Sequence, residues 1–494
     1  MSMAGPFASF WEVFATAARI HPDREAVADS AGPLTYGALA QATDTLARDL
    51  ARRAGKERVF GLLLPRSVDA VAALVAVTRL GGVPVLLPPS APVRELAAMI
   101  ATAAPSMLIT SPPLIETARS AGASVHIAVV QAGKVTGLVR GRARGRRPSR
   151  ETHGHDDRLV LFTSGTTGVP KGVVHSQRAV ISNACAVARA LALEATDVTM
   201  IGLPLHHSYG LNHLLAHAVC GGRVLLGGHS PVPGLFGPPG WSDAVTNIPF
   251  VPTSLRLFLM QHRSRRIPFP KLRMAVSAGG MCSVGLVVGL RCQFPAVALW
   301  NNYGQTEAGP RVTCGPMPAG GVTGWVGPPL PGISVRAVDE DGHDVRGAPC
   351  EIWVKTPYVM LGYLGRPGET ADVLRDGWLR TGDVGELNAM GTLYLDGRLS
   401  EIVNCGGIRT HTRAVEDALR SHPAVADACV VGVLHETFGT VAKAFVVVSE
   451  PTSAVTLQQF CRQSLTPQAV PREIVFMEAL PRTESGKILK RLLA

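Results

Sequence analysis

The sequence contains the glycine- and threonine-rich run Thr163-Ser-Gly-Thr-Thr-Gly-Val-Pro-Lys171-Gly172, which follows the apolar, strand-like run Leu159 to Phe162. Its glycines let the backbone approach a polyanion closely, its hydroxyl and N–H groups can bind phosphate oxygens, and Lys171 adds a positive charge. Pro170 stands where the common nucleotide loop G-x-x-x-x-G-K-[ST] needs Gly, which disfavours an ordinary phosphate-loop NTPase. Alone, the run fits either a phosphate-binding loop or a flexible turn.

Outward from this run, helical and strand-like patterns alternate. The apolar runs Val59 to Leu64 and Val83 to Leu87 are typical of strands, and Val68 to Arg79 between them is typical of a helix. This alternation predicts an α/β fold with buried parallel sheets. Short strands after about residue 330 predict a β-rich subdomain, and a compact α+β piece follows Gly397-Arg398. We therefore predict a large domain over residues 1–397 and a small one over residues 398–494.

Composition excludes several classes of protein. The chain has 494 residues, 46% hydrophobic and 17% charged, which indicates two or more globular domains rather than a disordered chain. No apolar run approaches the ~20 residues of a membrane span, and the N-terminus lacks the pattern of a signal peptide. Nine scattered cysteines without a C-x-x-C pair favour reduced thiols and a cytoplasmic location. The sequence leaves the oligomeric state open.

The formal net charge of +11 includes a basic run from Arg140 to Arg150. Such a run can contact nucleic acid or a membrane, or it can be a solvated loop between folded parts. No aromatic residues are interleaved for base stacking, which favours the solvated loop. We therefore expect no nucleic-acid partner, and a basic balance also suits an enzyme with anionic substrates.

Three further motifs carry chemistry. In Tyr303-Gly-Gln-Thr306-Glu307 an aromatic ring can stack on adenine, a hydroxyl can bind a phosphate oxygen and a carboxylate can bind Mg²⁺. Arg380-Thr-Gly-Asp383, followed by Gly397-Arg398, offers a carboxylate that can accept both ribose hydroxyls. Pro481-Arg-Thr-Glu-Ser-Gly-Lys487 offers a lysine that can swing onto an anion. Each of these motifs alone also fits an exposed turn with solvated charges.

Together and in this order, the four motifs resemble those of the acyl-adenylating superfamily of acyl-CoA synthetases, peptide-synthetase adenylation domains and luciferases. The resemblance covers essentially the whole chain. It implies ATP-dependent activation of a carboxylic acid to an acyl-AMP with release of pyrophosphate, followed by thioester formation with CoA as the expected thiol. It also implies a need for Mg²⁺ and a small, mobile C-terminal domain that rotates about a hinge at Ser400.

The resemblance implies a role for each matching residue. The triphosphate loop would contain Thr163, Ser164, Gly165, Thr166, Thr167, Gly168 and Lys171. The adenine-binding segments would contain Ala278, Gly279, Gly280, Asn301, Asn302, Tyr303 and Gly304. Thr306 would contact the α-phosphate and Glu307 the Mg²⁺ ion. Asp383 and Arg398 would contact ribose and phosphate, and Lys487 would bridge the acid's carboxylate and the α-phosphate.

The acid is expected to be a plain carboxylic acid. Leu203-Pro-Leu-His-His207-Ser-Tyr209-Gly resembles the motif beside the acyl pocket, with His207 as a gate, Tyr209 as a wall and Gly280 also in the pocket, whereas His206 is expected to be a packing residue. Amino-acid-specific domains usually carry an Asp here, and a buried ammonium without a partner is costly. The Pro/Gly-rich stretch 231–240 suggests an apolar acid, with aryl, alicyclic and fatty acids all fitting.

The thiol acceptor stays open. Within Glu401 to Glu416, which resembles the segment that serves the thioester half-reaction, Thr412 stands where Pro is common and Ala414 where Glu is frequent. The product could therefore pass to CoA, or from an acyl-AMP ligase to a carrier-protein thiol or a partner enzyme. A degenerate nucleotide-binding scaffold is disfavoured because the charged motif residues are all present: Lys171, Glu307, Asp383, Arg398 and Lys487.

Overall fold

The computed structural model describes residues 7–54, 58–122, 124–141, 158–163, 170–227, 238–405, 408–482 and 488–493. The chain divides into two compact units. The first comprises Met1–Ser334 and Val354–Leu379, and the second comprises Val335–Trp353 and Arg380–Ala494. The domain boundary expected between residues 397 and 398 stays a prediction. Of the basic run at 140–150, only Arg140 and Gly141 are among the described residues.

The first unit contains an eight-stranded sheet in the order β15-β14-β13-β12-β10-β11-β1-β2. The pairs from β14 through to β1 are parallel, and the two outermost pairs are antiparallel. The strands are β1 (Glu25–Asp29), β2 (Gly32–Thr35), β10 (Val198–Ile201), β11 (Arg223–Leu226), β12 (Asn247–Phe250), β13 (Met274–Ser277), β14 (Ala298–Tyr303) and β15 (Thr313–Pro316).

A second eight-stranded sheet of this unit has the order β19-β9-β8-β4-β3-β5-β6-β7. Its central pairs from β8 to β6 are parallel, while β9 runs antiparallel to both β8 and β19. The strands are β3 (Val59–Leu63), β4 (Val83–Leu86), β5 (Met107–Thr110), β6 (His126–Gln131), β7 (Lys134–Val139), β8 (Arg158–Thr163), β9 (Lys171–Ser176) and β19 (Gly362–Tyr363).

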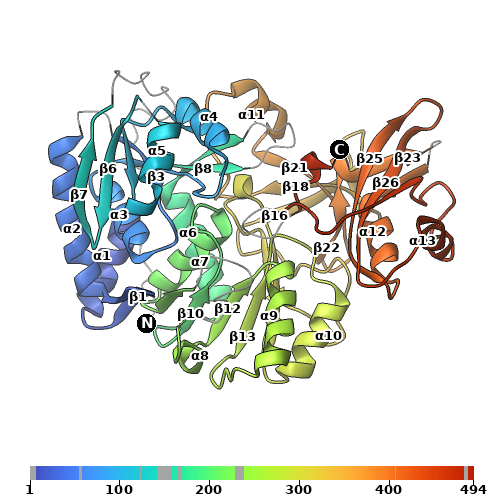
Figure 1. The fold of residues 1–494 in the computed structure, drawn as a ribbon, viewed down its shortest axis with the longest axis horizontal. Coiled ribbons are helices and arrows are strands. Elements are labelled where there is room, and N and C mark those ends of the chain that lie inside the picture. The colour runs from blue at the N-terminus through green and yellow to red at the C-terminus, as the bar shows by residue number, and fades with distance from the viewer. Residues whose placement is uncertain are drawn as a thin grey trace. The chain divides into compact units, whose positions relative to one another are not determined.

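Helices separate and cover these two sheets (Figure 1). Helix α3 (Val68–Arg79) contacts β1 of the first sheet and β3, β4 and β6 of the second, and α6 (Gln177–Ala190) contacts β15 and β9, so both lie between the sheets. A helix between two sheets must be apolar on most of its surface, and α3 is accordingly buried from Val71 to Thr78. The others are α1 (Phe10–Ile20), α2 (Tyr36–Arg53), α4 (Val93–Ala103), α5 (Ile115–Ala121), α7 (Ser208–Ala218), α8 (Trp241–Ala244), α9 (Pro252–Arg265), α10 (Val284–Gln293) and α11 (Pro367–Val373).

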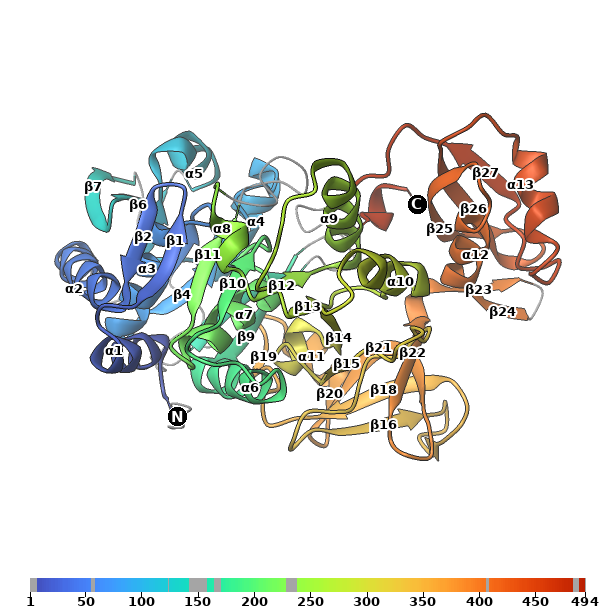
Figure 2. The ribbon, with the colours of Figure 1, turned by 90° about the horizontal axis from the view of Figure 1, so that it is seen from below.

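The second unit holds most of a six-stranded sheet and all of a five-stranded one (Figure 2). The six-stranded sheet has the order β17-β16-β18-β21-β20, with β22 also paired to β21. Its strands are β16 (Ser334–Val338), β17 (Asp344–Val345), β18 (Cys350–Lys355), β20 (Leu374–Arg375), β21 (Trp378–Leu387) and β22 (Leu393–Arg398).

The five-stranded sheet has the order β24-β23-β26-β25, with β27 paired to β26, and α12 packs on β25. Its elements are β23 (Ile402–Cys405), β24 (Ile408–His411), α12 (Thr412–Arg420), β25 (Val425–His435), β26 (Gly439–Val448), α13 (Ala454–Cys461) and β27 (Glu473–Phe476). Parallel sheets layered with helices, a β-rich part and a C-terminal α+β piece confirm the predicted fold class. The mobility expected for the C-terminal piece stays a prediction.

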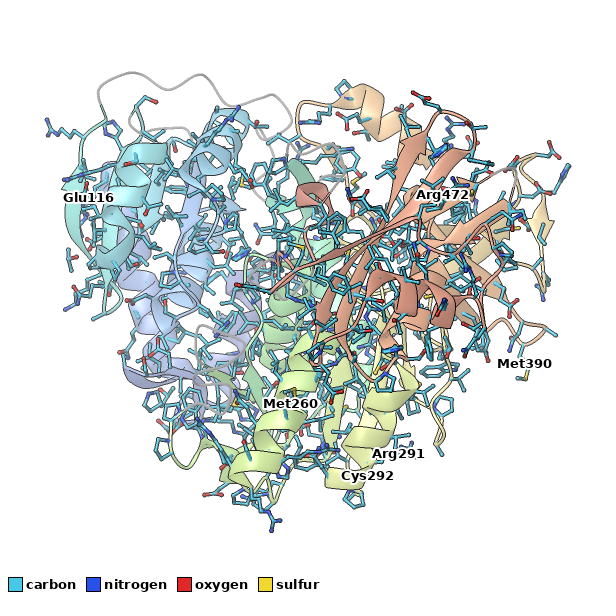
Figure 3. The ribbon with its side chains drawn as sticks, turned by 45° about the vertical axis from the view of Figure 1, so that its right-hand side comes forward. Glu116, Met260, Arg291, Cys292, Met390 and Arg472 are labelled. Carbon is cyan, nitrogen blue, oxygen red and sulfur yellow. The ribbon has the colours of Figure 1, made fainter. Side chains whose placement is uncertain are left out.

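The structure also bears on membrane-spanning helices and on the state of the cysteines. Within the part of the chain that the structure describes, no helix is both long and apolar enough to cross a membrane. All nine cysteines are unpaired thiols, and most of them are buried. Cys292 is the exposed exception and lies on α10 next to Arg291 (Figure 3).

Candidate functional site

The antiparallel pairing of β8 and β9 brings the two ends of the glycine-rich run together. In this register Thr163 lies opposite Lys171, and the pairing continues to Arg158 opposite Ser176. Residues 164–169, which include the predicted Ser164, Gly165, Thr166, Thr167 and Gly168, lie outside the described residues. The described ends therefore place a hydroxyl and an ammonium at the same edge of the second sheet.

Lys171 already binds an anionic group. Its Nζ lies 2.6 Å from Oε2 of Glu369 in α11 and 4.9 Å from the centre of the Tyr363 ring. Hydrogen bonds from Lys171 and then from Arg366 hold the pKa of the Glu369 carboxyl below its usual value. The ammonium is thus positioned where a negatively charged oxygen can reach it.

Thr306 and Glu307 lie in the short helix η2 (Thr306–Ala308), just after β14, and each is tied to another element. The Tyr363 hydroxyl donates to Oε1 of Glu307 at 3.0 Å, and the hydroxyls of Ser208 and Thr306 are 2.9 Å apart. The Tyr363 ring contacts Lys171 and its hydroxyl contacts Glu307, so β19 connects the lysine and the carboxylate.

His175 of β9 joins the cluster formed by Lys171, Thr306, Glu307 and Tyr363. Its Nε2–H donates to the carbonyl oxygen of Thr306 at 2.7 Å, and its Nδ1 has no partner among the described residues. Burial lowers the pKa of His175 to about 4, although the bond to Thr306 opposes that shift. The ring is therefore a neutral donor that positions the backbone of Thr306 near pH 7.

Sequence reasoning missed Ser208, Tyr363, Glu369 and His175. Side chains alternate along a strand, so Lys171 and His175 share one face of β9, and this spacing could have flagged the histidine. Tyr363 reaches the cluster because it pairs with Val173 across the sheet, far from it in sequence. No local pattern predicts such a contact.

The segments expected to bind adenine lie side by side. Ser277 of β13 pairs with Asn301 of β14 in parallel, so residues 278–280 and 302–304 leave the same carboxyl edge of the first sheet. Gly279 has a φ of +76°, a left-handed conformation that glycine adopts without strain. A Cβ on Gly304 would lie 2.0 Å from the Pro310 carbonyl oxygen, so only glycine fits there.

The expected acyl-pocket residues His207 and Tyr209 lie at the start of α7. The Tyr209 hydroxyl donates to the Val276 carbonyl at 2.8 Å, which brings this turn to the end of β13, just before Ala278, Gly279 and Gly280. The rings of His206 and His207 lie 4.5 Å apart. Burial, and then the neighbouring charges of His207 and Arg66, lower the pKa of His206 well below its usual value, so its ring is neutral near pH 7, and its role as a packing residue stays a prediction.

In the second unit, Asp383 and Arg398 lie opposite each other on β21 and β22. Nε of Arg398 is 2.9 Å from Oδ1 of the buried Asp383. Ser400, the expected hinge, follows in the short helix η3 (Leu399–Glu401). The structure thus brings the predicted ribose and phosphate residues together and places them immediately before the predicted hinge.

Lys487 lies outside the described residues, but the described residues on either side of it have contacts of their own. Arg482 forms a β-bridge with Ile488, and Arg482 also pairs with Asp427 of β25. On the other side, Lys490 in η4 (Lys490–Leu492) contacts three groups: Glu416 at 3.1 Å, Glu401 at 3.3 Å and the Thr412 hydroxyl at 3.2 Å. Lys490 therefore connects η4 to α12 and to the segment after Ser400.

This contact gives the unusual Thr412 a structural role. Its side chain is buried and accepts a hydrogen bond from Lys490, which a proline at that position could not do. Burial alone would lower the pKa of Lys490, but the negative charges of Glu416 and Glu401 outweigh burial, so the pKa is raised above its usual value. Ala414, the other departure, is exposed on α12.

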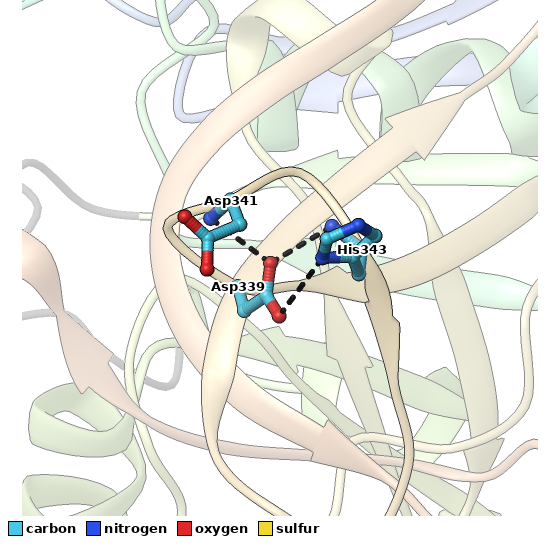
Figure 4. A group of neighbouring side chains, drawn as sticks. All are labelled: Asp339, Asp341 and His343. Carbon is cyan, nitrogen blue, oxygen red and sulfur yellow. Dashed lines mark hydrogen bonds and ion pairs between the residues drawn. The ribbon is translucent and has the colours of Figure 1, made fainter.

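One group of acidic and histidine side chains lies in a hydrogen-bonded turn. Asp339, Asp341 and His343 lie within reach of one ion between β16 and β17 (Figure 4). Oδ1 of Asp339 instead accepts the backbone N–H groups of Asp341 at 3.0 Å and His343 at 2.8 Å. These bonds account for the grouping without an ion.

Burial of neutral His175 makes stability depend on pH. Its folded pKa of about 4 lies below the ordinary histidine pKa of 6.5, so below pH 6.5 the unfolded chain binds a proton that the folded chain does not. The stability linked to His175 is therefore fully present above pH 6.5 and falls toward pH 4, by up to about 1.4 kcal/mol per pH unit. His175→Gln keeps a donor but does not titrate, so urea unfolding at several pH values should show a shallower acid dependence. Equal slopes in wild type and His175→Gln would contradict this assignment.

The anchor at Lys490 can be tested in the same way. Lys490→Met leaves Glu416 and Glu401 with one cation fewer, and the expected loss of unfolding free energy is about 2 kcal/mol. Thr412→Val should lose about 1 kcal/mol, the value of one hydrogen bond. Arg413→Met, which removes a surface pair with Asp417, should cost less than about 1 kcal/mol. Equal losses for Lys490→Met and Arg413→Met in denaturant titrations would refute the anchor.

Comparisons with known proteins agree with this geometry. The family model "AMP-binding enzyme" matches residues 14–364, and "AMP-binding enzyme C-terminal domain" matches residues 414–487. A long-chain-fatty-acid–CoA ligase of Yersinia pestis is 33% identical over 350 residues, which are 68% of this chain and 61% of that relative. A 2-succinylbenzoate–CoA ligase of Bacillus licheniformis is 30% identical over 488 residues, covering 96% of this chain and 98% of the relative.

The fold comparison gives the same answer. The o-succinylbenzoate CoA synthetase MenE of Bacillus subtilis, solved with its acyl-adenylate intermediate, superposes with a TM-score of 0.83 at 26% identity over 97% of both chains. The same enzyme has also been solved with ATP and a magnesium ion. The chain spans only 61% of the length of the fatty-acid ligase named above, but nearly all of both succinylbenzoate enzymes. The chain therefore belongs to the AMP-binding enzyme family, as the order of its four motifs indicates.

Proposed function

We propose that the protein activates a carboxylic acid with ATP to an acyl-AMP, releases pyrophosphate, and then transfers the acyl group to CoA. The observation that carries the proposal is the cluster of Lys171, Thr306 and Glu307, held together by Tyr363, Ser208 and His175. It combines a cation, a hydroxyl and an oriented carboxylate, the groups needed to bind a nucleotide triphosphate with its metal ion.

The cluster fits both ATP and Mg²⁺. The Glu369 carboxylate on Lys171 stands in for an anionic oxygen, and a phosphate oxygen of ATP would replace it. Glu307 would hold Mg²⁺, since the Tyr363 hydroxyl fixes the direction of its carboxylate. When bound, Mg²⁺ neutralises charge on the phosphates and so lowers the barrier to attack by a second anion.

The reaction balances without any further reactant. A carboxylate oxygen of the acid attacks the α-phosphorus, a new P–O bond forms, and the bond to the β-phosphate oxygen breaks so that pyrophosphate leaves. The thiol of CoA then attacks the acyl carbonyl carbon, AMP leaves with the bonding electron pair, and the thiol proton passes to solvent. Both reactants of the first step are anions, so positioning and charge neutralisation supply most of the catalysis.

We assign the remaining groups by their places in the chain. Lys487 would neutralise the acid's carboxylate and the α-phosphate, and Asp383 and Arg398 would bind the ribose and phosphate. His207, Tyr209 and Gly280 would border the acid. Residues 278–280 and 301–304 would hold the adenine, supported by the parallel pairing of β13 and β14.

CoA is the proposed acceptor because the relatives are named CoA ligases. The departures at Thr412 and Ala414 do not argue against it, since Thr412 binds Lys490 and Ala414 is exposed. Transfer to a carrier-protein thiol is the alternative for the second step alone. The nine unpaired thiols support a reducing, cytoplasmic location.

The test is mass spectrometry of reactions that contain ATP, Mg²⁺ and a panel of carboxylic acids, with and without CoA. We expect acyl-CoA and AMP when CoA is present, and acyl-AMP with pyrophosphate when it is absent. Acyl-AMP that accumulates even with CoA would favour the carrier-protein alternative. ADP as the nucleotide product would refute the proposed first step.

Lys487→Ala should separate the two half-reactions. Without the ammonium, acid-dependent exchange of pyrophosphate into ATP should fall by at least ~100-fold, because charge neutralisation is lost. Thioester formation from preformed acyl-AMP should stay within ~3-fold of wild type, because that step does not join two anions. The exposed control Lys271→Ala should retain both activities. An equal fall in both half-reactions would contradict the role given to Lys487.

Tyr363→Phe tests the orientation of Glu307. The ring beside Lys171 remains, but the hydroxyl that donates to Glu307 is lost. Loss of about 1 kcal/mol should raise the Mg²⁺ concentration for half-maximal activity about 5-fold, with little change in kcat at saturating Mg²⁺ or in Tm. Tyr394→Phe is the matched control. A fall in kcat at an unchanged Mg²⁺ requirement would refute this positioning role.

A further inference from the structure

Arg311, just after η2, is a buried cation that forms no ion pair with a carboxylate of the described residues. Arg311 is 1% exposed. The other buried arginine among the described residues is Arg66, which serves as a comparison. Arg66 donates to the carbonyl oxygens of Gly202 at 2.7 Å and Gly227 at 3.0 Å. By contrast, Nε and Nη2 of Arg311 have no hydrogen-bond partner among the described residues.

The position of Arg311 is fixed by its neighbours. The side-chain amide of Asn183 in α6 makes two hydrogen bonds with the backbone of Arg311. Its Nδ2 donates to the Arg311 carbonyl oxygen at 2.8 Å, and its Oδ1 accepts from the Arg311 N–H at 3.3 Å. The guanidinium carbon lies 4.2 Å from the centre of the Tyr209 ring. With the Asn302 amide turned so that its oxygen faces Arg311, Nη1 donates to it at 2.6 Å. Stacking on a ring face uses none of the in-plane N–H groups, so two donors stay available.

No described carboxylate forms an ion pair with Arg311. Burial lowers its pKa, and the groups that oppose this shift are Tyr209 and Cys314 rather than an Asp or Glu. An arginine side chain nevertheless keeps its charge in proteins. A buried charge without a partner costs several kcal/mol, and the planar fork of a guanidinium matches the two oxygens of a carboxylate. Among the described residues, therefore, no anion balances the charge of Arg311.

We propose that Arg311 binds a second carboxylate of the acid substrate, so that the enzyme activates one end of a dicarboxylic acid. This inference rests on the proposed function, in which Tyr209 borders the acid and Asn302 belongs to the adjoining strand. The second carboxylate accepts from Nε and Nη2 of Arg311, while the first is adenylated. The part of the acid between the two carboxylates can still be aryl, alicyclic or aliphatic.

The experiment compares acids that differ only in the second carboxylate. Straight-chain monocarboxylic acids are paired with the dicarboxylic acids of equal length, and benzoate is paired with the three benzenedicarboxylates. For wild type, kcat/KM from pyrophosphate release should favour the best dicarboxylate over its partner by at least ~100-fold, as expected when a buried donor would otherwise be left unpaired. Arg311→Met should abolish that preference and leave the monocarboxylate rate within ~3-fold of wild type. Arg311→Lys should retain part of it, because a point charge replaces the bidentate fork.

Acid binding without ATP gives an independent readout. The preferred dicarboxylate alone should raise the Tm of wild type and of the surface control Arg265→Met, but not that of Arg311→Met. The Tm of ligand-free Arg311→Met should be no lower than that of wild type, since replacing an unmatched buried charge by an apolar side chain is neutral or stabilising.

Three results would overturn the inference. One is equal kcat/KM for mono- and dicarboxylates in wild type. Another is a Tm loss in Arg311→Met, which would show a structural partner for the cation. The third is protection of wild type, but not Arg311→Met, by ATP alone, which would assign Arg311 to the nucleotide phosphates. Failure of every acid to release pyrophosphate would instead refute the proposed function, and the binding readout would still report on Arg311.

Discussion

The antiparallel pairing of β9 with both β8 and β19 is the constraint on which the candidate site depends. On one side the pairing sets Lys171 opposite Thr163, and on the other it brings Tyr363 beside Val173. A register shift of one residue would turn Lys171 and His175 to the other face of the sheet. The hydrogen bonding of β8, β9 and β19 therefore fixes the relative positions of the residues that would hold the nucleotide.

A second constraint is the polar interior around α7. His213, Asn247 and His217 form a hydrogen-bonded chain, with distances of 3.2 Å and 3.1 Å between successive groups. Burial lowers the pKa of His217 to about 4, so that ring avoids a buried charge near pH 7 by staying neutral. Arg311 cannot respond in this way, because its guanidinium does not lose a proton under such conditions. This difference makes an anionic ligand the natural partner of Arg311.

The sequence predicted the features that depend on local order. Alternating apolar runs gave the α/β class, and four motifs in order gave the family. The same motifs located Thr163, Lys171, Thr306, Glu307, Asp383 and Arg398, and the structure pairs the first with the second and the last two with each other.

The groups that orient these residues were not predictable, because they come from distant parts of the chain. Glu369 and Tyr363 lie about two hundred residues after Lys171 and reach it only through the added strand β19. The bond between Lys490 and Thr412 converts an apparent departure from the family pattern into a structural contact. Arg311 follows a recognised motif, but the lack of described partners for its Nε and Nη2 is visible only when the surrounding side chains are in place.

In the proposed first step, a carboxylate oxygen of the acid attacks the α-phosphorus of ATP. The most direct test uses an acid that supports pyrophosphate release, labelled with oxygen-18 in its carboxylate, followed by mass spectrometry of the nucleotide after thioester formation. We expect one labelled oxygen to appear in AMP, because the oxygen that formed the new P–O bond leaves with the nucleotide. Unlabelled AMP, with the label in inorganic phosphate or pyrophosphate, would contradict it.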